Sequence, residues 1–207
     1  MIKATDYNVC SGKAYCVLYN ESTGIPEDLA SLAKPENLLA HIKGGATLSY
    51  KPTFYEDHDD LEEVSIMFPT KEEVTFKTKF ITWNAEVLEK LCQTAVVENN
   101  DTTGEEIIDI GGAENFKDNR YILYFVGEGA AANGLKILMK GYNKAGFDIS
   151  FVKDNATQPE MEFVCEGFKK PNGKTTKARI FRKGQKVVQA PDQTTEDTIQ
   201  EDKDQGQ

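Results

Sequence analysis

The sequence predicts an all-β to α+β fold, an antiparallel β-sandwich with one packed α-helix, a long inter-strand loop and flexible termini. Three observations lead to this class. Apolar and polar residues alternate with a period of two through much of the chain, one segment carries a clear helical stripe, and no repeat of about 20 to 50 residues is present. Many strands with few helices favour a sandwich over a parallel sheet.

The alternation marks four strands. It runs through residues 46–54 and 74–80, and it returns at 147–151 and 160–166. Because successive side chains of a strand point to opposite faces, each strand should have one face in the core and one in water. In the first strand we expect the core face to carry Ala46, Leu48, Tyr50 and Phe54, and the polar face to carry Thr47, Ser49 and Thr53. In the last strand we expect the polar face to carry Glu160, Glu162 and Glu166.

Further strands and helices complete the prediction. The continuous apolar run YILYFV, residues 121–126, is typical of a strand covered on both faces, and short strands are expected near 14–19, 106–110 and 178–183. The clearest helix covers residues 82–95, with Thr82 as N-cap and Glu86 in the first turn. Its apolar stripe consists of Val87, Leu88, Leu91 and Ala95. A shorter helix is predicted through PEDLASLA, with Pro26 at its first position.

The chain is expected to form one domain over residues 1–185, followed by an acidic, disordered tail over 186–207. No proline- or glycine-rich linker divides the first part of the 207 residues. Residues 191–207 hold six acids and one lysine, and Ile199 is their single apolar residue. Such a segment buries too little surface to offset its ordering entropy. It could serve as a solubilising tail or as an arm that orders against a partner.

Composition excludes several classes of protein. No apolar run has the length of a signal peptide or a membrane span, so we expect an unexported chain without membrane contact. A formal net charge of −10 argues against a clamp for nucleic acid. The four cysteines show no metal-ligand spacing with each other or with His41 and His58, so Cys10, Cys16, Cys92 and Cys165 should be reduced core residues and no metal is expected.

No arrangement of catalytic residues is apparent. The chain lacks a G-x-S-x-G elbow, a Walker A lysine and an H-E-x-x-H pair, so no enzymatic activity and no cofactor are expected. The strongest competing motif is GEGAAANG, in which Gly127, Gly129 and Ala132 fit the dinucleotide-binding turn after a strand. Residues 135–142 fit helical spacing as well as strand alternation. The absence of a second βαβ unit speaks against that motif.

Two charged segments stand out as candidate contact sites. The stretch between the strands ending near Phe54 and beginning near Val74 is too long for a hairpin turn, and loops of this length are usually functional or disordered. It carries acids followed by apolar residues, namely Glu56, Asp57, Asp59, Asp60, Glu62 and Glu63, then Ile66, Met67 and Phe68. Its EDHDD run lacks the spacing of an EF-hand. Apolar residues in an extended loop need a surface to cover.

The second segment is basic and surrounds the tight turn Pro171-Asn172-Gly173. A solvated hairpin would explain it, but it also complements the acidic loop between copies of the chain. If the two lie at opposite ends of a subunit, their contact is head to tail and builds columns. The basic residues are Lys169, Lys170, Lys174, Lys177, Arg179, Arg182 and Lys183.

Three passages and the acidic loop carry a family resemblance. The passages are IPEDLASLAKPENLLAHIKGGATLSYKPTFYE, EVTFKTKFITWNAEVLEKL and AGFDISFVKDNATQPEMEFVCEGF. Together with the loop they resemble the tail tube, or major tail, proteins of long-tailed bacteriophages and phage-tail-like particles. The resemblance is one of pattern and extends over about residues 1–183.

This resemblance implies a β-sandwich flanked by a helix and assembled as hexameric rings that stack into a hollow tube. Residues 52–73 match the family's stacking loop, 82–95 its packed helix, and 1–10 and 185–207 its terminal arms. The implied partners are further copies of the chain and other tail proteins such as the tape measure, terminator and distal tail proteins. DNA would pass through the lumen without specific binding, and the protein would be part of a virion assembled in the bacterial cytoplasm.

Residue chemistry agrees with that expectation. An antiparallel sandwich has sheet edges, and joining edges around a ring removes them. Polar strand faces with excess acid would then line a bore that repels the DNA backbone. Two alternatives stay open at this point: a β-sandwich module that binds carbohydrate or protein through its loops, and a small dinucleotide-binding enzyme that uses Gly127 and Gly129.

Overall fold

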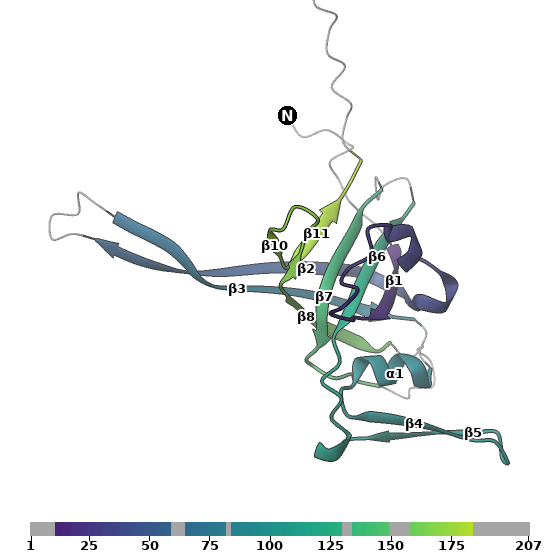
Figure 1. The fold of residues 1–207 in the computed structure, drawn as a ribbon. Helices are drawn as coiled ribbons and strands as arrows, with labels where there is room; N and C mark the ends of the chain where they lie inside the picture. Colours follow the sequence, from purple (N-terminus) through teal and green to yellow (C-terminus); the bar gives the residue numbers. More distant parts are fainter. Residues whose placement is uncertain (1–10, 59–64, 82–83, 130–133, 150–157, 184–207) are drawn as a thin grey trace, which may run out of the picture.

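The computed structural model describes residues 11–58, 65–81, 84–129, 134–149 and 158–183. Its main sheet has seven strands in the order β11-β7-β6-β1-β2-β3-β8, and every neighbouring pair is antiparallel (Figure 1). The strands are β1 (Ser11–Leu18), β2 (Leu38–His58), β3 (Ser65–Phe80), β6 (Tyr121–Glu128), β7 (Lys136–Asn143), β8 (Glu160–Glu166) and β11 (Ala178–Phe181). The predicted β-rich antiparallel fold is confirmed.

The sheet closes on itself through β7. One edge of β7 pairs with β6, and the other pairs with β11 through residues 136–139 and with β8 through residues 140–143. The two walls that the sequence suggests as layers of a sandwich are therefore parts of one closed sheet. Closure brings the strands close together at Gly141, where a Cβ atom would lie 1.8 Å from the carbonyl oxygen of Val164. Only glycine fits at that position.

Inward-facing side chains fill the space enclosed by the sheet. The alternation predicted for 74–80 and 160–166 is confirmed, because Phe76, Phe80 and Phe163 are buried while Lys77, Lys79 and Glu162 are more exposed. The rings of Phe76 and Phe125 face each other across this core with centroids 5.7 Å apart. Burial of these large apolar side chains is the main driving force for folding.

A second, smaller cluster covers the outside of β6. It contains Ile122, Tyr124 and Leu138 of the sheet together with Leu32 and Phe168. The predicted burial of both faces of YILYFV is thereby confirmed. Leu32 comes from a 3₁₀-helix, Leu29–Leu32, capped by the side chain of Asp28, so the α-helix predicted through PEDLASLA is wrong. A second 3₁₀-helix, Pro35–Asn37, leads into β2.

The predicted packed helix exists but is shorter than 82–95. Helix α1 covers Ala85–Leu91, and its N-cap is Asn84, whose side chain accepts a hydrogen bond from the Val87 amide at 2.8 Å. The expected cap, Thr82, lies outside the described residues. The chain turns at Cys92 and enters a strand at Ala95. Val87 and Leu91 pack into the core of the closed sheet.

Asn143 fixes the end of this helix to the sheet. It is 6% exposed, and its side-chain amide donates to the Leu91 carbonyl at 2.7 Å and to the Gly146 carbonyl at 2.5 Å. Its side-chain oxygen accepts from the Glu162 amide at 2.9 Å. One buried side chain thus satisfies backbone groups of the helix, of β8 and of the segment after β7.

Two small hairpins extend from the main sheet. One pairs β4 (Ala95–Asn100) with β5 (Glu105–Ile110), and a 3₁₀-helix, Ala113–Asn115, follows it. The other pairs β9 (Phe168–Lys169) with β10 (Thr175–Thr176) around the predicted turn, in which the Gly173 amide donates to the Lys170 carbonyl. The prediction of a strand over 147–151 is wrong for residues 147–149, which belong to no strand. Residues 150 and 151 lie outside the described residues.

The predicted terminal segments, 1–10 and 186–207, also lie outside the described residues. Within the part of the chain that is described, no helix is long and apolar enough to cross a membrane.

Candidate interaction surfaces

The segment predicted as a long inter-strand loop is largely a pair of strands. The β2–β3 ladder continues past a register shift between Thr53 and Phe54 to Asp57 opposite Ile66 and His58 opposite Ser65, and only residues 59–64 between them are not described. Figure 1 shows this hairpin extending far beyond the closed sheet. Cross-strand contacts hold it, including the Tyr55 and Phe68 rings with centroids 5.1 Å apart. We call residues 50–58 and 65–73 the hairpin arm.

The hairpin arm exposes large apolar side chains on both faces. Ile66 is 59% exposed and Met67 is 62% exposed, and as neighbours on one strand they point to opposite faces. Half of the large exposed hydrophobic residues in the described chain lie here: Tyr50, Phe54, Tyr55, Ile66, Met67 and Phe68. The expectation that Tyr50 and Phe54 face the core is therefore wrong, because β2 leaves the closed sheet before it reaches them.

Two of the six predicted loop acids lie at the outer end of the described hairpin arm. Glu56 and Asp57 are exposed there, and Asp57 accepts hydrogen bonds from the Tyr55 hydroxyl at 3.1 Å and from the His58 amide at 3.0 Å. No ion pair involves either acid among the residues described. The other four predicted loop acids, Asp59, Asp60, Glu62 and Glu63, fall on residues that are not described.

The predicted basic hairpin forms around β9, β10 and β11, but it does not lie opposite the hairpin arm. The Lys177 ammonium donates to the Glu72 carbonyl, which places the basic hairpin against the base of the arm. Lys169 lies in β9, Arg179 lies in β11, and Arg182 and Lys183 follow β11. The two segments that the sequence pairs by charge are therefore neighbours at one end and separate toward the tip.

Several of these cations have no carboxylate partner. Within the described chain no ion pair involves Lys169, Lys170, Lys174 or Arg179, and Arg179 stacks over the Phe181 ring at 5.0 Å. We call these four residues the basic patch. Two open grooves of about 540 Å³ flank β11 and are lined partly by Lys170 and Arg179. Free cations beside open grooves form a surface suited to an acidic partner.

The β4–β5 hairpin was only half recognised in the sequence, because 106–110 alone was predicted as a strand. All residues of β5 except Ile108 are exposed, including Ile107 and Ile110. Its acids Glu105, Glu106 and Asp109 form no ion pair with any described cation. The turn DTTG between AVVENN and EEIIDI, with Gly104 at φ +72°, is the signal that could have identified the hairpin.

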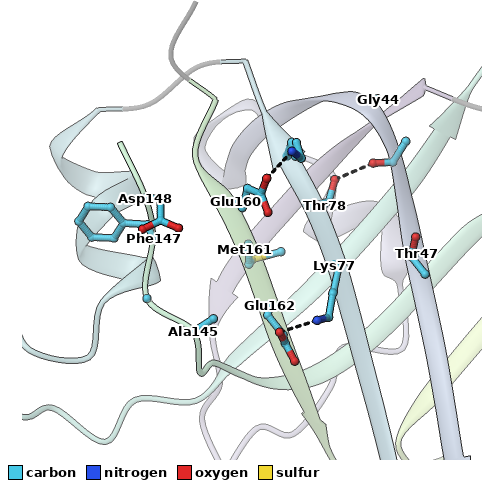
Figure 2. Close-up of a pocket in the computed structure, with 13 residues that line it drawn as sticks. Gly44, Thr47, Lys77, Thr78, Ala145, Phe147, Asp148, Glu160, Met161 and Glu162 are labelled. Atoms are coloured by element: carbon cyan, nitrogen blue, oxygen red, sulfur yellow. Dashed lines mark hydrogen bonds and ion pairs between the residues drawn. The ribbon is translucent and has the colours of Figure 1, made fainter. Parts of the chain in front are cut away.

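A cleft of about 280 Å³ lies between β2, β3, β8 and residues 145–148 (Figure 2). Gly44 and Gly45 shape one wall, since their φ values of +77° and +88° form the bulge where β2 shifts register against β3. Figure 2 shows Lys77 and Glu162 paired across the neighbouring strands, at 2.7 Å. Lys79 pairs with Glu160 in the same way. The cleft contains no nucleophile set beside a general base.

These ion pairs change the expected charge of the polar strand faces. Glu160 and Glu162 face lysines of β3, and Glu166 pairs with Arg120 at 2.7 Å. The polar face of β2, β3 and β8 is therefore balanced in charge at these positions, whereas the sequence suggested an excess of acid. The prediction treated each strand separately, whereas the register of β3 against β8 places Lys77 opposite Glu162 and Lys79 opposite Glu160.

The dinucleotide-binding interpretation of GEGAAANG is contradicted. Residues 136–143 form β7, which pairs antiparallel with β6, so a strand stands where that motif requires a helix N-terminus. Gly127 and Gly129 belong to the end of β6 and its turn. Among the described residues that follow β6, none belongs to a helix whose N-terminus could hold a pyrophosphate.

Two of the described thiols are buried in the core. Cys16 and Cys165 are buried in the core as expected, and burial raises the pKa of each from 9.0 to about 12. Both are therefore protonated and unreactive near neutral pH. Cys92 is partly exposed, and Cys10 is not described. In the described residues no group of three or more histidine, cysteine or acidic side chains is arranged to hold a metal ion.

No model of a known protein family matches the sequence, and no curated protein matches it significantly.

Proposed function

We propose that this chain is a structural, non-enzymatic subunit that self-assembles into stacked hexameric rings, as in a bacteriophage tail tube. The observation that carries this proposal is the hairpin arm, a two-stranded extension with exposed apolar side chains on both faces. A hairpin of this kind is marginally stable alone in water, and contiguous apolar exposure is uncommon on monomeric proteins. Packing against neighbouring copies would cover both faces at once.

In this proposal the assembled tube is a conduit for DNA in a virion. Its polar lining would come from strand faces such as that of β2, β3 and β8, where Lys77 and Lys79 are already paired with glutamates. Paired lysines release few counterions when they meet a phosphate, so DNA would slide past without specific binding. The further partners would be the other tail proteins that begin, measure and end a tube, and no membrane would take part.

The test is assembly of the purified full-length chain. Its mass should be followed by light scattering after size exclusion over a wide range of protein concentration, and concentrated samples should be imaged by negative stain. Rings with sixfold symmetry or hollow tubes are expected. A chain that stays monomeric at every concentration and ionic strength would contradict the proposal.

A module that binds carbohydrate or protein is the second candidate, and the aromatic residues of the hairpin arm favour it. Tyr55 and Phe68 form an exposed aromatic pair that could stack on a sugar. This alternative predicts a monomer that binds glycans on an array and loses that binding in Tyr55→Ala. The assembly proposal predicts no glycan binding and a concentration-dependent mass.

A further inference from the structure

Among the open strand edges in the described part of the molecule, those of β11 and β5 carry opposite charge. β11 pairs with β7 on one side, and no other described strand hydrogen-bonds to its outer edge. β5 pairs with β4 alone among the described strands. Open strand edges present rows of amide and carbonyl groups that are a template for pairing with another chain.

The edge of β11 is basic. The grooves on its two sides are lined by Lys170 and Arg179, and the basic patch has no carboxylate partner in the described chain. Ile180, which is 58% exposed, adds an apolar side chain to this edge. Ile180 lies opposite Ile137 of β7, so its side chain points to the same face as the core. β8 pairs with β7 only at residues 140–143, so no described strand lies beside Ile180 on that side.

The edge of β5 is acidic and equally uncovered. Glu105, Glu106 and Asp109 share this strand with three isoleucines, of which Ile107 is 43% exposed and Ile110 is 59% exposed. The combination of acids and isoleucines on β5 complements Arg179 and Ile180 on β11 and the lysines of the neighbouring β9–β10 hairpin. The two edges cannot meet within one molecule, because the closed sheet and α1 separate them (Figure 1).

The edges of the hairpin arm are less suited to strand pairing. Pro52 lies in β2 and Pro69 lies in β3, and each removes a backbone donor from the outer edge. Lys51 and Lys71 further protect these edges, as lysines do on edge strands. Neither β5 nor β11 contains a proline, and β5 contains no lysine. The arm is thus built for side-chain packing, while β5 and β11 keep their backbones available.

We propose that β5 of one copy of this chain adds as a strand to the free edge of β11 in a second copy, with the acids of β5 facing the basic patch. The contact is heterologous, since each copy offers β5 to one neighbour and β11 to the other, so it can propagate around a ring or along a column. This inference rests on the self-assembly proposed above and assigns it a specific pair of strands.

Charge reversal provides the test. One variant carries Glu105→Lys, Glu106→Lys and Asp109→Lys on β5, and the other carries Lys169→Glu, Lys170→Glu and Arg179→Glu on the basic patch. Each alone places like charges together, and the protein concentration at half-assembly should rise at least about tenfold. Mixed in equal amounts, the two variants should assemble again, because each then meets an oppositely charged neighbour. A control, Glu21→Lys with Glu36→Lys, changes exposed acids that belong neither to β5 nor to the basic patch and should assemble normally.

Folding of each variant is checked by circular dichroism and thermal unfolding. If a reversal variant does not fold, the neutral set Glu105→Gln, Glu106→Gln and Asp109→Asn replaces it, with the same direction of effect. Strand addition itself is tested by oxidising a mixture of Ile107→Cys and Ile180→Cys chains. A cross-link between copies is expected, since paired strands bring Cβ atoms within about 5 Å.

Several results would overturn this assignment. If the unaltered chain assembles and the β5 reversal assembles equally well, β5 is not the partner, although the proposed function stands. If reversal of Glu56 and Asp57 instead rescues the patch variant, the occupant is the hairpin arm. If deletion of residues 187–207 reproduces the patch variant while the β5 reversal has no effect, the occupant is the acidic tail. An unaltered chain that never assembles contradicts both proposals.

Discussion

Replacing the exposed apolar residues of the hairpin arm should weaken assembly while leaving the monomer folded. Ile66→Ser alters one face of the arm and Met67→Ser alters the other, so the two variants report separately on the two surfaces. Because both side chains are exposed in the monomer, its unfolding free energy should change by less than about 0.5 kcal/mol. The effect on assembly should be larger, because the neighbouring copy supplies the burial.

Its magnitude follows from the exposed fractions. Burying a whole side chain of this size stabilises by about 1.5 to 3 kcal/mol, and about three-fifths of each remains to be buried, at 59% for Ile66 and 62% for Met67. Each contact should therefore lose about 1 to 2 kcal/mol. That corresponds to a rise of about 5- to 30-fold in the protein concentration at half-assembly.

The measurement is sedimentation velocity over a concentration series, with thermal unfolding of the monomer in parallel. Leu18→Ser is the matched control, since Leu18 is 57% exposed but lies at the end of β1 and away from the arm. Normal assembly of both arm variants, from a chain whose unaltered form assembles, would refute the argument that the arm is buried between copies. An equal loss in Leu18→Ser would show that apolar exposure in general, and not the arm, drives association.

Four further results are expected. Asn143→Ala should destabilise the fold by about 2 to 3 kcal/mol, because it leaves buried backbone groups without partners, and chemical denaturation would show a lower midpoint. Asn84→Ala should remove the helix cap at a cost of about 1 kcal/mol, seen as a fall in Tm of about 2 to 4 °C, and Asn84→Ser should retain most of it. Gly141→Ala should lower the free energy of unfolding by about 3 kcal/mol or prevent the pairing of β7 with β8. Either effect should appear as faster amide exchange in β8, and unchanged exchange would contradict the closure of the sheet. Finally, burial raises the pKa of Cys16 and Cys165 to about 12. The contribution of these protonated thiols to the free energy of unfolding is therefore complete below pH 9 and is lost as pH rises toward 12. Cys16→Ala should show a shallower loss of stability over that range.

Much of the fold could be read from local pattern. The burial of YILYFV on both faces, the alternation in 74–80 and 160–166 and the turn at Pro171-Asn172-Gly173 were all predicted, and each depends on residues close together in the sequence. The helix was found but placed too long, because Ala95 continues the apolar spacing although Cys92 already leaves the helix. The spacing of apolar residues cannot distinguish a last helical turn from the first residue of a strand.

The candidate surfaces were located less well. The stretch between Phe54 and Val74 was singled out because acids and apolar residues meet there, and its described residues belong to the hairpin arm. Strand pairing beyond Phe54 was not predicted, because Pro69 and the acids weaken the alternation that signals a strand. The basic hairpin was recognised from its charge, but its contact with Glu72 at the base of the arm depends on residues 105 positions apart.

The sequence by itself determined the alternation in 74–80 and 160–166, the position of the charged segments and several of the strands, since neighbouring side chains and turn residues govern these features. The tertiary structure alone decided that the sheet closes through β7, that the lysines of β3 neutralise the glutamates of β8, and that the edges of β5 and β11 stay open. Pairing of distant strands decides each of these, because a shift of one residue in register would move every side chain of a strand to the opposite face.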